Sequence, residues 1–445
     1  MTRGHGVTEQ HAPIHVVVVG GGFAGVACAR RLAKEDGVSV TLIDKNDYHQ
    51  FQPLLYQVAT SMLAAGDIAY PLRKIAQEYD GFEAKRGEVA AIDPTTRTVT
   101  TTTGETYAAD YVVLAAGSQP NFFGTPGAEH AFPLYSLDDA DRLRTRVIQT
   151  FEEADRDPHL ADEGAIDFVI VGGGPTGVEV AGALSEMINT TMVAEFPALA
   201  PRAVVHLVDH GHALLAMFAD KGHAYAARVL EKDGVELRMG TAVSSIGPGH
   251  VTLSDGSTIL TRCVIWGGGL MAAPIAGSSG LPQGRGGRID VRPDFTVDGF
   301  PGVLAIGDVA NIPAGDGKTH PQLGSVALQS GSWAARTILA DRQRKTAKPF
   351  SYLDKGTMAM IGRGAAVAQV RGIELHGKMA FAAWLGVHAA LMTGGSNRVS
   401  AFKSWARDFF GKERAPEALD RSGTARLVWE EDDADTAAPP RVATH

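Results

Sequence analysis

A glycine-rich turn between two buried strands occurs twice in this chain, and this repeat constrains the fold more than any other feature. Residues 14–19, IHVVVV, form a continuous apolar run typical of a strand buried on both faces of a parallel sheet. The run leads into GGGFAG and the helical sequence AGVACARRLAKE, and a second apolar run, VSVTLID, ends at Asp44. Strand, glycines, helix, strand and terminal acid in this order predict a Rossmann-like dinucleotide-binding unit.

The spacing assigns a physical role to each of the key positions in this unit. Gly20 is expected to make the tight turn, and Gly22 to let the backbone approach a pyrophosphate at the helix N-terminus. Gly25 is expected to let the helix pack closely on the strand. Asp44 can accept hydrogen bonds from a ribose. All four are predicted cofactor-binding residues.

The second copy reads IDFVIVGGGPTGVEVAGAL, with Gly172, Gly174 and Gly177, and its next strand, VVHLVD, ends at Asp209. The distance along the chain from the first glycine to the acid is 24 residues in the first copy (44 − 20) and 37 residues in the second (209 − 172). The connection between the two strands is therefore about a dozen residues longer in the second copy. Each copy is followed by a hairpin pattern and a buried strand that ends in small residues: RTVTTTTGETYAADYVVLAAGS and HVTLSDGSTILTRCVIWGGGL. The repeat predicts an α/β chain with two Rossmann-like domains.

Composition narrows the chemistry. A chain of 445 residues, 44% hydrophobic, can bury two or three cores, and its 52 glycines show no collagen period. The two cysteines, Cys28 and Cys263, exclude a disulfide-stapled fold and a four-thiolate metal site, so no metal is predicted and redox chemistry must come from a bound cofactor. A net charge of −9 argues against nucleic acid as the main partner.

The first thirteen residues lack the order of a secretory signal, and no eighteen apolar residues run together, so we expect a cytoplasmic protein that does not span a membrane. Residues 379–392, MAFAAWLGVHAALM, are apolar apart from His388 but too short to cross a bilayer. This stretch predicts an interfacial helix, a buried helix or a dimer contact.

The next segment, residues 396–414, has the pattern of a basic amphipathic helix on an anionic membrane surface. Its pattern also fits a core-facing helix with a solvated face. The apolar residues at helical intervals are Val399, Phe402, Ala406, Phe409 and Phe410, and the basic ones are Arg398, Lys403, Arg407, Lys412 and Arg414. The tail after residue 415, with its acidic run at 430–433, is expected to be disordered.

Together these motifs resemble the two-dinucleotide-binding flavoproteins. In that superfamily the first copy holds FAD, the second holds NAD(P)H, and the chain then returns to complete the first domain. Residues 294–313, DFTVDGFPGVLAIGDVANIP, match this return, and the resemblance assigns Asp308 to the ribityl chain of FAD.

Within that superfamily, residues 14–412 are most similar to the type II NADH dehydrogenases, the single-subunit NADH:quinone oxidoreductases. The distinctive matches are HQFQPLLYQVATSMLAAGDIAYPLR at 49–73, GTMAMIGRGAAVA at 356–368 and AAWLGVHAALMTGGSNRV at 382–399. The resemblance implies the following division of the chain: an FAD-binding domain at 14–125 and 291–345, an NADH-binding domain at 126–290, an acceptor-site and membrane-docking region at 346–415, and disordered ends at 1–13 and 416–445.

This resemblance implies an enzyme of electron transport that passes electrons from NADH through FAD to a membrane quinone without pumping protons. The protein would lie on the inner face of the cell membrane, and a homodimer stays open. Gly172, Gly174 and Gly177 would hold the pyrophosphate of NADH, and Asp209 would repel the extra phosphate of NADPH. The expected cofactor-binding residues also include Lys45, Val89, Gly117 and Gly269.

Two residues are predicted to be catalytic. The resemblance places Glu179 between nicotinamide and flavin, and the alternative interpretation is an acid that complements the helix dipole. Gln329 matches the second glutamine of the family's A-Q-x-x-x-Q quinone-site motif, on a helix beginning near Gly324 whose N-terminus would point at the flavin pyrimidine ring. Ser325 replaces the first glutamine, and Gln322 offers a substitute amide. Ala365 likewise stands where many relatives have a lysine.

The sequence also excludes some relatives. Disulfide reductases of the superfamily carry two cysteines near the end of the second strand of the first domain, whereas NDYHQFQPLLYQVAT at 46–60 has none. Cys28 and Cys263 are expected to be small core residues. Two other functions stay open: a soluble NADH-dependent reductase of a protein carrier, a small molecule or oxygen, and a non-catalytic flavoprotein that senses NADH.

Overall fold

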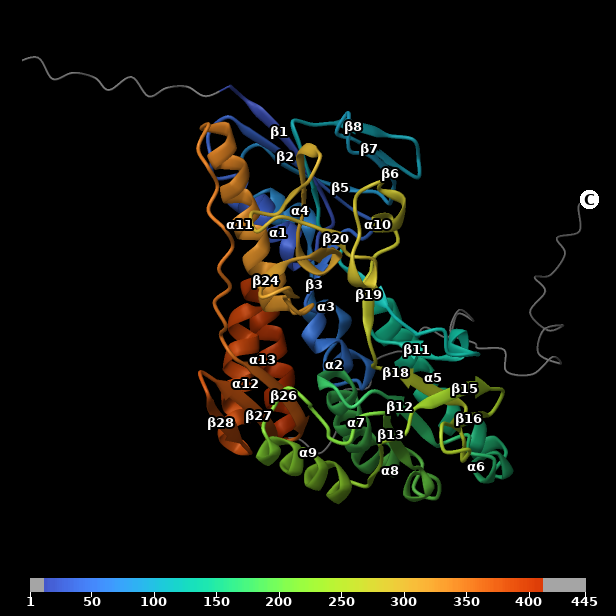
Figure 1. The fold of residues 1–445 in the computed structure, drawn as a ribbon. Helices are drawn as coiled ribbons and strands as arrows, with labels where there is room; N and C mark the ends of the chain where they lie inside the picture. The colour runs from blue at the N-terminus through green and yellow to red at the C-terminus, as the bar shows by residue number, and fades with distance from the viewer. Residues whose placement is uncertain (1–11, 411–445) are drawn as a thin grey trace, which may run out of the picture. The chain divides into compact units, whose positions relative to one another are not determined.

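The computed structural model describes residues 12–410, and side chains as far as residue 407 (Figure 1). The described residues form two compact units: the first comprises 12–50, 69–119 and 270–354, and the second 51–68, 120–269 and 355–410. Apart from residues 12 and 13, the predicted disordered ends lie outside the described residues, as do the side chains of Phe409 and Phe410.

The first unit is built on a six-stranded sheet with the strand order β21-β22-β9-β1-β2-β5. Five of these strands run parallel, and β21 runs antiparallel to β22. The strands are β1 (Ile14–Val19), β2 (Val38–Asp44), β5 (Phe82–Arg86), β9 (Tyr111–Leu114), β21 (Thr296–Val297) and β22 (Phe300–Ala305). The apolar run at 14–19 is thus a central strand, as predicted, and β22 confirms the predicted return of the chain.

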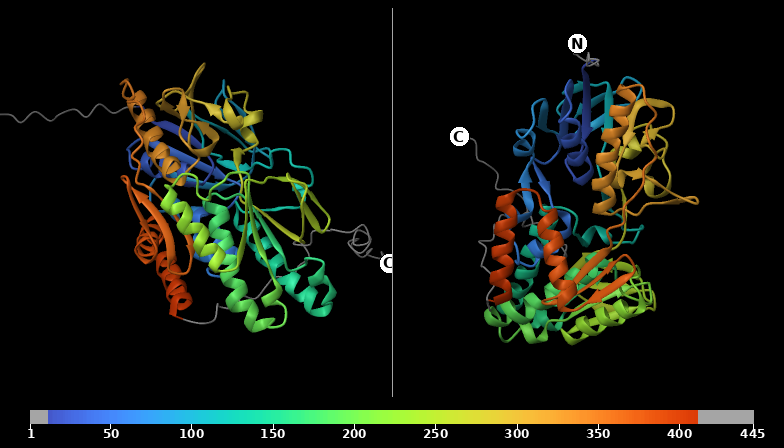
Figure 2. Two further views of the ribbon diagram at one scale, coloured as in Figure 1. Left: turned by 60° about the horizontal axis from the view of Figure 1, so that its bottom comes forward. Right: turned by 90° about the vertical axis from the view of Figure 1, so that its left-hand side faces the viewer.

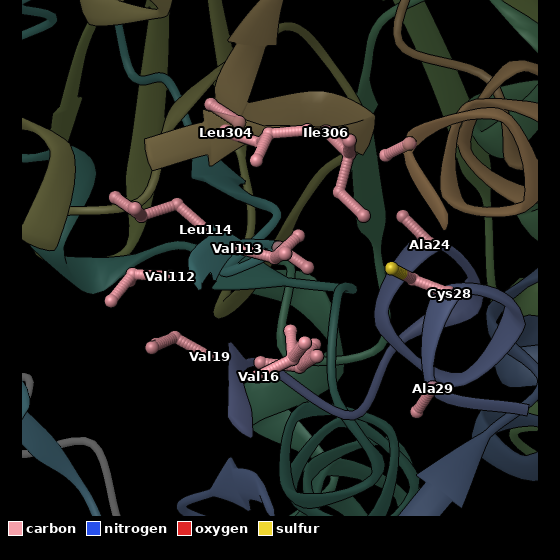
Figure 3. Close-up of a cluster of buried hydrophobic side chains, with 14 of the residues drawn as sticks. Val16, Val19, Ala24, Cys28, Ala29, Val112, Val113, Leu114, Leu304 and Ile306 are labelled. Carbon is pink, nitrogen blue, oxygen red and sulfur yellow. The ribbon is translucent and has the colours of Figure 1, made fainter. Parts of the chain in front are cut away.

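Helices α1 (Phe23–Leu32) and α11 (Gly324–Arg342) pack side by side in this unit (Figure 1). Their approach is so close that a Cβ atom on Gly331 would lie 2.0 Å from the carbonyl oxygen of Ala24. Figure 3 shows Cys28 of α1 among aliphatic side chains that include Val16, Val113 and Leu304. Cys28 is therefore a core residue, in agreement with the sequence prediction.

A small antiparallel sheet follows the Rossmann strands of the first unit. It contains β6 (Val89–Asp93), β7 (Thr98–Thr101) and β8 (Thr106–Ala108) and leads directly into β9. The strands β3 (Tyr48–Gln50) and β4 (Ala69–Pro71) pair antiparallel. They flank residues 51–68, which belong to the second unit. The first predicted hairpin is therefore confirmed.

The second unit has a parallel five-stranded sheet in the order β11-β18-β12-β13-β14. The strands are β11 (Phe132–Pro133), β12 (Phe168–Val171), β13 (Val205–Asp209), β14 (Val235–Met239) and β18 (Cys263–Trp266). The main helices are α5 (Leu137–Arg156), α7 (Pro175–Met187) and α9 (Asp220–Lys232). The second predicted hairpin is β16 (His250–Leu253) with β17 (Thr258–Leu260), and it pairs with β15 (Val243–Gly247).

The longer second crossover has a clear structural origin. After α7 the chain continues through a π-helical turn at Ile188–Met192 and the short helix α8 (Val193–Glu195) before it enters β13. In the first unit the chain passes from α1 to β2 through a short turn. The extra residues therefore lengthen the connection and leave the Rossmann geometry unchanged.

The C-terminal region belongs to the second unit, which differs from the predicted boundaries. It contains β26 (Thr357–Gly362), β27 (Ala365–Val370), β28 (Ile373–His376), α12 (Lys378–Leu391) and α13 (Gly395–Phe410), and the two helices lie side by side (Figure 2). Strand β26 packs so closely on α7 that a Cβ atom on Gly182 would lie 1.7 Å from the carbonyl oxygen of Ile361. Of the predicted region at 346–415, residues 346–354 thus belong to the first unit and residues 355–410 to the second.

Residues 51–68, predicted to lie in the FAD-binding domain, also pack in the second unit. They contain α2 (Leu55–Ala59) and α3 (Ala65–Ile68). The indole N–H of Trp405 on α13 donates to Gln57 Oε1 at 2.7 Å, and Asn397 Nδ2 donates to the carbonyl oxygen of Gly66 at 3.1 Å. These hydrogen bonds attach α13 to residues 51–68.

None of the described helices has both the length and the apolar composition needed to cross a membrane. Helix α12 buries Trp384 and His388, whereas Met379 and Leu391 on the same helix are exposed. The helix thus has a buried side and an exposed side, and neither a fully buried nor a fully interfacial helix describes it alone.

Candidate functional site

The two glycine-rich loops have the same backbone geometry. The first glycine of each loop is in a region that L side chains rarely adopt, with φ of +111° at Gly20 and +113° at Gly172. The last glycine allows an equally close approach, since a Cβ atom on Gly25 or Gly177 would lie 1.8 Å from the carbonyl oxygen of Gly20 or Gly172. Both positions require glycine, because any side chain would overlap the backbone.

The middle glycine of each loop faces open space instead. A Cβ atom on Gly22 or Gly174 would have no neighbour within 4 Å. Each residue is the N-cap of its helix, α1 or α7, and no side chain caps either helix. A pyrophosphate binds where backbone N–H groups are unsatisfied, the helix dipole is positive and there is free space. Both loops have these features and therefore fit a dinucleotide.

The acids at the strand ends hold these loops in place. Gly21 N–H donates to Asp44 Oδ2 at 2.5 Å, and Gly173 N–H donates to Asp209 Oδ2 at 2.6 Å. The other oxygen of each carboxylate accepts the N–H two residues further along the chain. A carboxylate oxygen can accept more than one hydrogen bond, so each acid can hold its loop and still accept a ribose hydroxyl.

Asp308 lies in the short turn η6 (Gly307–Val309), directly after β22. Burial raises the pKa of its carboxyl, while the Ser118 hydroxyl, which donates to Oδ2 at 3.1 Å, and the Arg288 guanidinium lower it. Ser118 follows the small-residue end of β9 and is not among the residues predicted from the sequence. Gln322 Nε2 donates to the carbonyl oxygen of Asp308 at 3.1 Å, so its amide is held beside this turn.

The remaining predicted cofactor residues are Lys45, Val89, Gly117 and Gly269. Lys45 is exposed immediately after Asp44, and Val89 is half-buried at the start of β6. Gly117 follows β9 with a φ of +73°, and Gly269 follows β18 with a φ of +66°. Gly269 lies in the second unit, and the other three lie in the first.

Gln329 is engaged by the backbone. Its Nε2 donates to the carbonyl oxygen of Leu353 at 3.0 Å, and Leu353 N–H donates to its Oε1 at 3.0 Å. One turn earlier on α11, Ser325 Oγ lies 2.8 Å from the hydroxyl of Tyr352. Gln329 and Ser325 thus clamp the segment around residue 353 onto α11, which starts at Gly324 as predicted. This clamp occupies the amide that the sequence assigned to the acceptor site.

Glu179 lies in the second turn of α7, and its carboxyl is enclosed by protein. Met360 N–H donates to Oε1 at 3.2 Å, and the indole nitrogen of Trp384 approaches the same carboxyl without reaching hydrogen-bond geometry. Burial raises its pKa to about 8, although both neighbours lower it. The helix dipole acts mainly on the first turn and would lower the pKa of Glu179, so burial outweighs it at this carboxyl.

A cavity of about 350 Å³ lies beside Glu179 in the second unit, and its walls are almost entirely apolar. Met360 and Trp384 contribute to its wall, together with Gln57, Trp405, Phe381 and Phe402. Gln57 is fully buried there, and its Nε2 donates to the Tyr56 hydroxyl at 3.0 Å. Sequence reasoning missed this hydrogen-bonded group, because its members are far apart along the chain.

Neither cysteine has the environment of a reactive thiol. Cys28 and Cys263 are fully buried, and burial raises the pKa of each thiol to about 12. A thiolate, the reactive form, is therefore scarce at neutral pH. The exclusion of thiol-relay chemistry is supported by the structure as well as by the sequence.

Comparisons with known proteins agree with this architecture. The family model described as pyridine nucleotide-disulphide oxidoreductase matches residues 14–331. The chain is 37% identical to the type II NADH:quinone oxidoreductase NdhA of Mycobacterium tuberculosis, over 93% of this chain and 90% of that protein. It is 29% identical to the type II NADH:quinone oxidoreductase of Staphylococcus haemolyticus, over 82% of this chain and 92% of that protein.

Solved structures show the same fold at lower sequence identity. NDH2 from Plasmodium falciparum in complex with NADH superposes with a TM-score of 0.83 at 17% identity, over 91% of this chain and 100% of that one. The sulfide:quinone oxidoreductase of Aquifex aeolicus superposes with a TM-score of 0.69 at 17% identity, over 90% of this chain and 96% of that one.

Proposed function

The chain belongs to the pyridine nucleotide-disulphide oxidoreductase family and, within it, to the type II NADH:quinone oxidoreductases, and from this we propose that it oxidises NADH and transfers the electrons through FAD to a quinone. One observation carries the proposal beyond the relatives' names. Each unit holds a complete glycine loop tied to a strand-end acid, and both thiols of the chain are buried. Two dinucleotide sites without a thiol relay are what electron transfer from NADH to flavin to an external acceptor requires.

The first unit would hold FAD. The open position at Gly22 and the N-terminus of α1 suit its pyrophosphate, Asp44 its ribose, and Asp308 its ribityl hydroxyls. When bound, the flavin supplies hydride acceptance and electron release, and the protein supplies orientation. The hydroxyl of Ser118 keeps the Asp308 carboxylate in position to accept from those hydroxyls.

The second unit would hold NADH, with the pyrophosphate at Gly174 and the adenosine ribose at Asp209. The Asp209 carboxylate is fixed at the end of β13 by Gly173 N–H. A fixed negative charge beside the ribose disfavours the extra phosphate of NADPH, so NADH is the preferred substrate.

Glu179 would hold the proton that the reaction consumes. Oxidation of NADH by a quinone, NADH + H⁺ + quinone → NAD⁺ + quinol, takes one proton from solution. With a pKa of about 8, Glu179 is mostly protonated at neutral pH. The backbone N–H of Met360 donates to Glu179, Trp384 approaches the same carboxyl, and both residues line the cavity. Only Met360 and Trp384 thus need to separate a proton on the Glu179 carboxyl from the cavity.

The cavity is the candidate acceptor site. Its volume of about 350 Å³ lies in the range of small-molecule pockets, and its apolar walls suit a quinone ring. Gln57 is a buried polar side chain in the wall. Its Nε2 already donates to the Tyr56 hydroxyl and its Oε1 accepts from Trp405, so the second N–H of its amide is the group that would donate to a quinone carbonyl. This assignment gives the acceptor a place that does not depend on Gln329.

The C-terminal helices would dock on an anionic membrane. Residues 378–407 contain four lysines and arginines and no acidic residue, although the whole chain carries a net charge of −9. Met379, Leu391 and Phe402 in this stretch are 71%, 49% and 62% exposed. Exposed apolar residues among cations are typical of a surface that binds anionic lipid headgroups, which would make the protein peripheral to the membrane. The homodimer stays a prediction that gel filtration can test.

Membrane docking can be tested by sedimentation with phosphatidylglycerol vesicles. We expect the double variant Met379→Ser with Leu391→Ser to bind these vesicles less than the unaltered protein, and salt to weaken binding of both. A matched control is Leu260→Ser, which changes an exposed apolar residue on β17. Equal sedimentation of all three proteins would contradict docking through these helices.

The activity is tested with purified protein, using NADH and NADPH as donors and a short-chain ubiquinone, a menaquinone analogue and oxygen as acceptors. We expect rapid flavin reduction by NADH and turnover with a quinone. Flavin reduction with turnover only on oxygen or a protein carrier would favour a soluble reductase. Flavin reduction with negligible turnover on every acceptor would favour a redox sensor.

A further inference from the structure

Phe123 combines two features that are unusual in one residue. Its φ is +53°, in the left-handed region that large side chains rarely adopt, and its side chain is 70% exposed. Among the exposed large apolar residues of the described chain, it is next to Met379 the most accessible. A strained backbone that presents an apolar ring to solvent is a recurring sign of a functional position.

The surrounding contacts hold this conformation at the end of β18. Phe123 N–H donates to Asn121 Oδ1 at 2.9 Å, and Asn121 N–H donates to the carbonyl oxygen of Gly269 at 3.1 Å. The indole N–H of Trp266 donates to the carbonyl oxygen of Asn121 at 3.0 Å, and the ring of Phe122 packs 5.3 Å from the Trp266 ring. The loop is therefore fixed on the strand rather than freely extended.

The ring of Phe123 lies on the backbone of Gly269. A Cβ atom on Gly269 would lie 2.3 Å from Phe123 Cζ, so one edge of the ring is in contact with this glycine. Gly269 follows β18, whose end also borders the second glycine loop: a Cβ atom on Gly172 would lie 3.1 Å from the Cα atom of Gly268. Phe123 is thus adjacent to the place where the pyrophosphate is expected.

The strand order decides which half of NADH would meet Phe123. The glycine loop follows β12, Asp209 ends β13 on one side of it, and Gly269 follows β18 on the other side. With the adenosine ribose at Asp209 and the pyrophosphate at the loop, the rest of the dinucleotide must extend toward β18. The nicotinamide half therefore lies on the side of Phe123.

We propose that Phe123 is a positioning residue that stacks on the nicotinamide ring of the bound dinucleotide. The inference rests on the proposed function, because it requires NADH in the second unit. The nicotinamide is flat and apolar on its faces, and an aromatic side chain that is already fixed at its position binds such a ring with little loss of side-chain entropy.

Binding of NAD⁺ and of ADP-ribose to the FAD-loaded protein tests the proposal by isothermal titration calorimetry. ADP-ribose lacks the nicotinamide ring and keeps the adenosine, the pyrophosphate and the second ribose. We expect Phe123→Ala and Phe123→Leu to bind NAD⁺ about fivefold more weakly, since a stacked aromatic pair is worth about 1 kcal/mol. Their affinity for ADP-ribose should stay unchanged, and Phe123→Tyr should bind NAD⁺ like the unaltered protein.

Further variants separate stacking from changes in the fold. Leu260→Ala removes an apolar side chain that is 50% exposed on β17 of the same unit, and it should leave both affinities unchanged. Phe123→Gly also removes the ring but suits the positive φ, so it should lose NAD⁺ affinity while its melting temperature stays the same or rises.

The outcomes distinguish this inference from the function on which it rests. Unaltered NAD⁺ affinity in Phe123→Ala, or an equal loss for ADP-ribose, overturns the stacking proposal and leaves the NADH site intact. Failure of the unaltered protein to bind either NAD⁺ or ADP-ribose overturns the proposed function itself.

Discussion

Glu179 gives the sharpest test of the site, because its protonation should be visible in the stability of the protein. Burial raises the pKa of its carboxyl from 4.5 to about 8 in the folded state. A group whose pKa is raised on folding stabilises the folded state through its bound proton. That stabilisation is complete below pH 4.5 and is lost as the pH rises through about 8. Glu179→Gln keeps the shape of the side chain and removes this dependence on pH.

The size of the effect follows from the pKa difference. A difference of 3.5 (8 − 4.5) corresponds to at most about 4.8 kcal/mol, at about 1.36 kcal/mol for each pKa unit. Glu179 as a whole is only half-buried, so solvent near the side chain screens part of this effect. We therefore expect about half of the limit, roughly 2 kcal/mol.

The assay is urea unfolding of the FAD-loaded protein between pH 5 and pH 9. From low to high pH, the unaltered protein should lose about 2 kcal/mol more unfolding free energy than Glu179→Gln. Glu195→Gln, which changes an exposed acid on α8 of the same unit, serves as the control and should follow the unaltered protein. Turnover of Glu179→Gln should be slowed with its FAD content retained. Parallel pH curves for the Gln variant and the unaltered protein would refute the buried-proton argument.

Three further predictions concern the two loops and the α11 clamp. Gly25→Ala should lose FAD, whereas Gly177→Ala should keep FAD but no longer be reduced by NADH, because each new Cβ atom would lie 1.8 Å from a carbonyl oxygen. Flavin absorbance measures the FAD content, and stopped-flow absorbance measures the reduction. FAD loss in both variants would contradict the assignment of the units. Asp209→Asn should raise kcat/KM for NADPH relative to NADH by about tenfold, because the substitution removes a fixed charge beside the ribose. Steady-state assays with both donors measure this ratio. An unchanged ratio would mean that Asp209 only holds the loop. Gln329→Ala should lower the unfolding free energy by about 1–2 kcal/mol, because it removes both hydrogen bonds to Leu353. If the variant instead loses quinone turnover at unchanged stability, Gln329 belongs to the acceptor site.

The Rossmann elements could be predicted because their signals are local. The buried run at 14–19, the positive φ at Gly20 and the close approach at Gly25 all depend on a few neighbouring residues. The same holds for the second copy, and the two loops agree closely in geometry. The return of the chain through β22 could be predicted as well, since the apolar strand and the acid at Asp308 are adjacent in sequence.

The boundaries of the units were less accessible to sequence reasoning. Residues 51–68 lie between elements of the first unit and yet pack in the second, because Gln57 and Gly66 bond to α13, more than 300 positions away. The family resemblance implied a C-terminal acceptor-site and membrane-docking region at 346–415, without saying which unit it packs on. Residues 355–410 of it join the second unit because a glycine on α7, Gly182, lets β26 approach.

By itself, the sequence determined that this chain has two dinucleotide-binding units, one strand-end acid in each and no thiol relay, since these depend on residue types and on spacings within a few turns of chain. Only the tertiary structure decided what surrounds the candidate site residues. It enclosed the Glu179 carboxyl against Met360, used the Gln329 amide to clamp Leu353, and held Phe123 over Gly269. Burial, hydrogen-bond partners and strain are set by residues that are distant in sequence and meet only when the chain is folded.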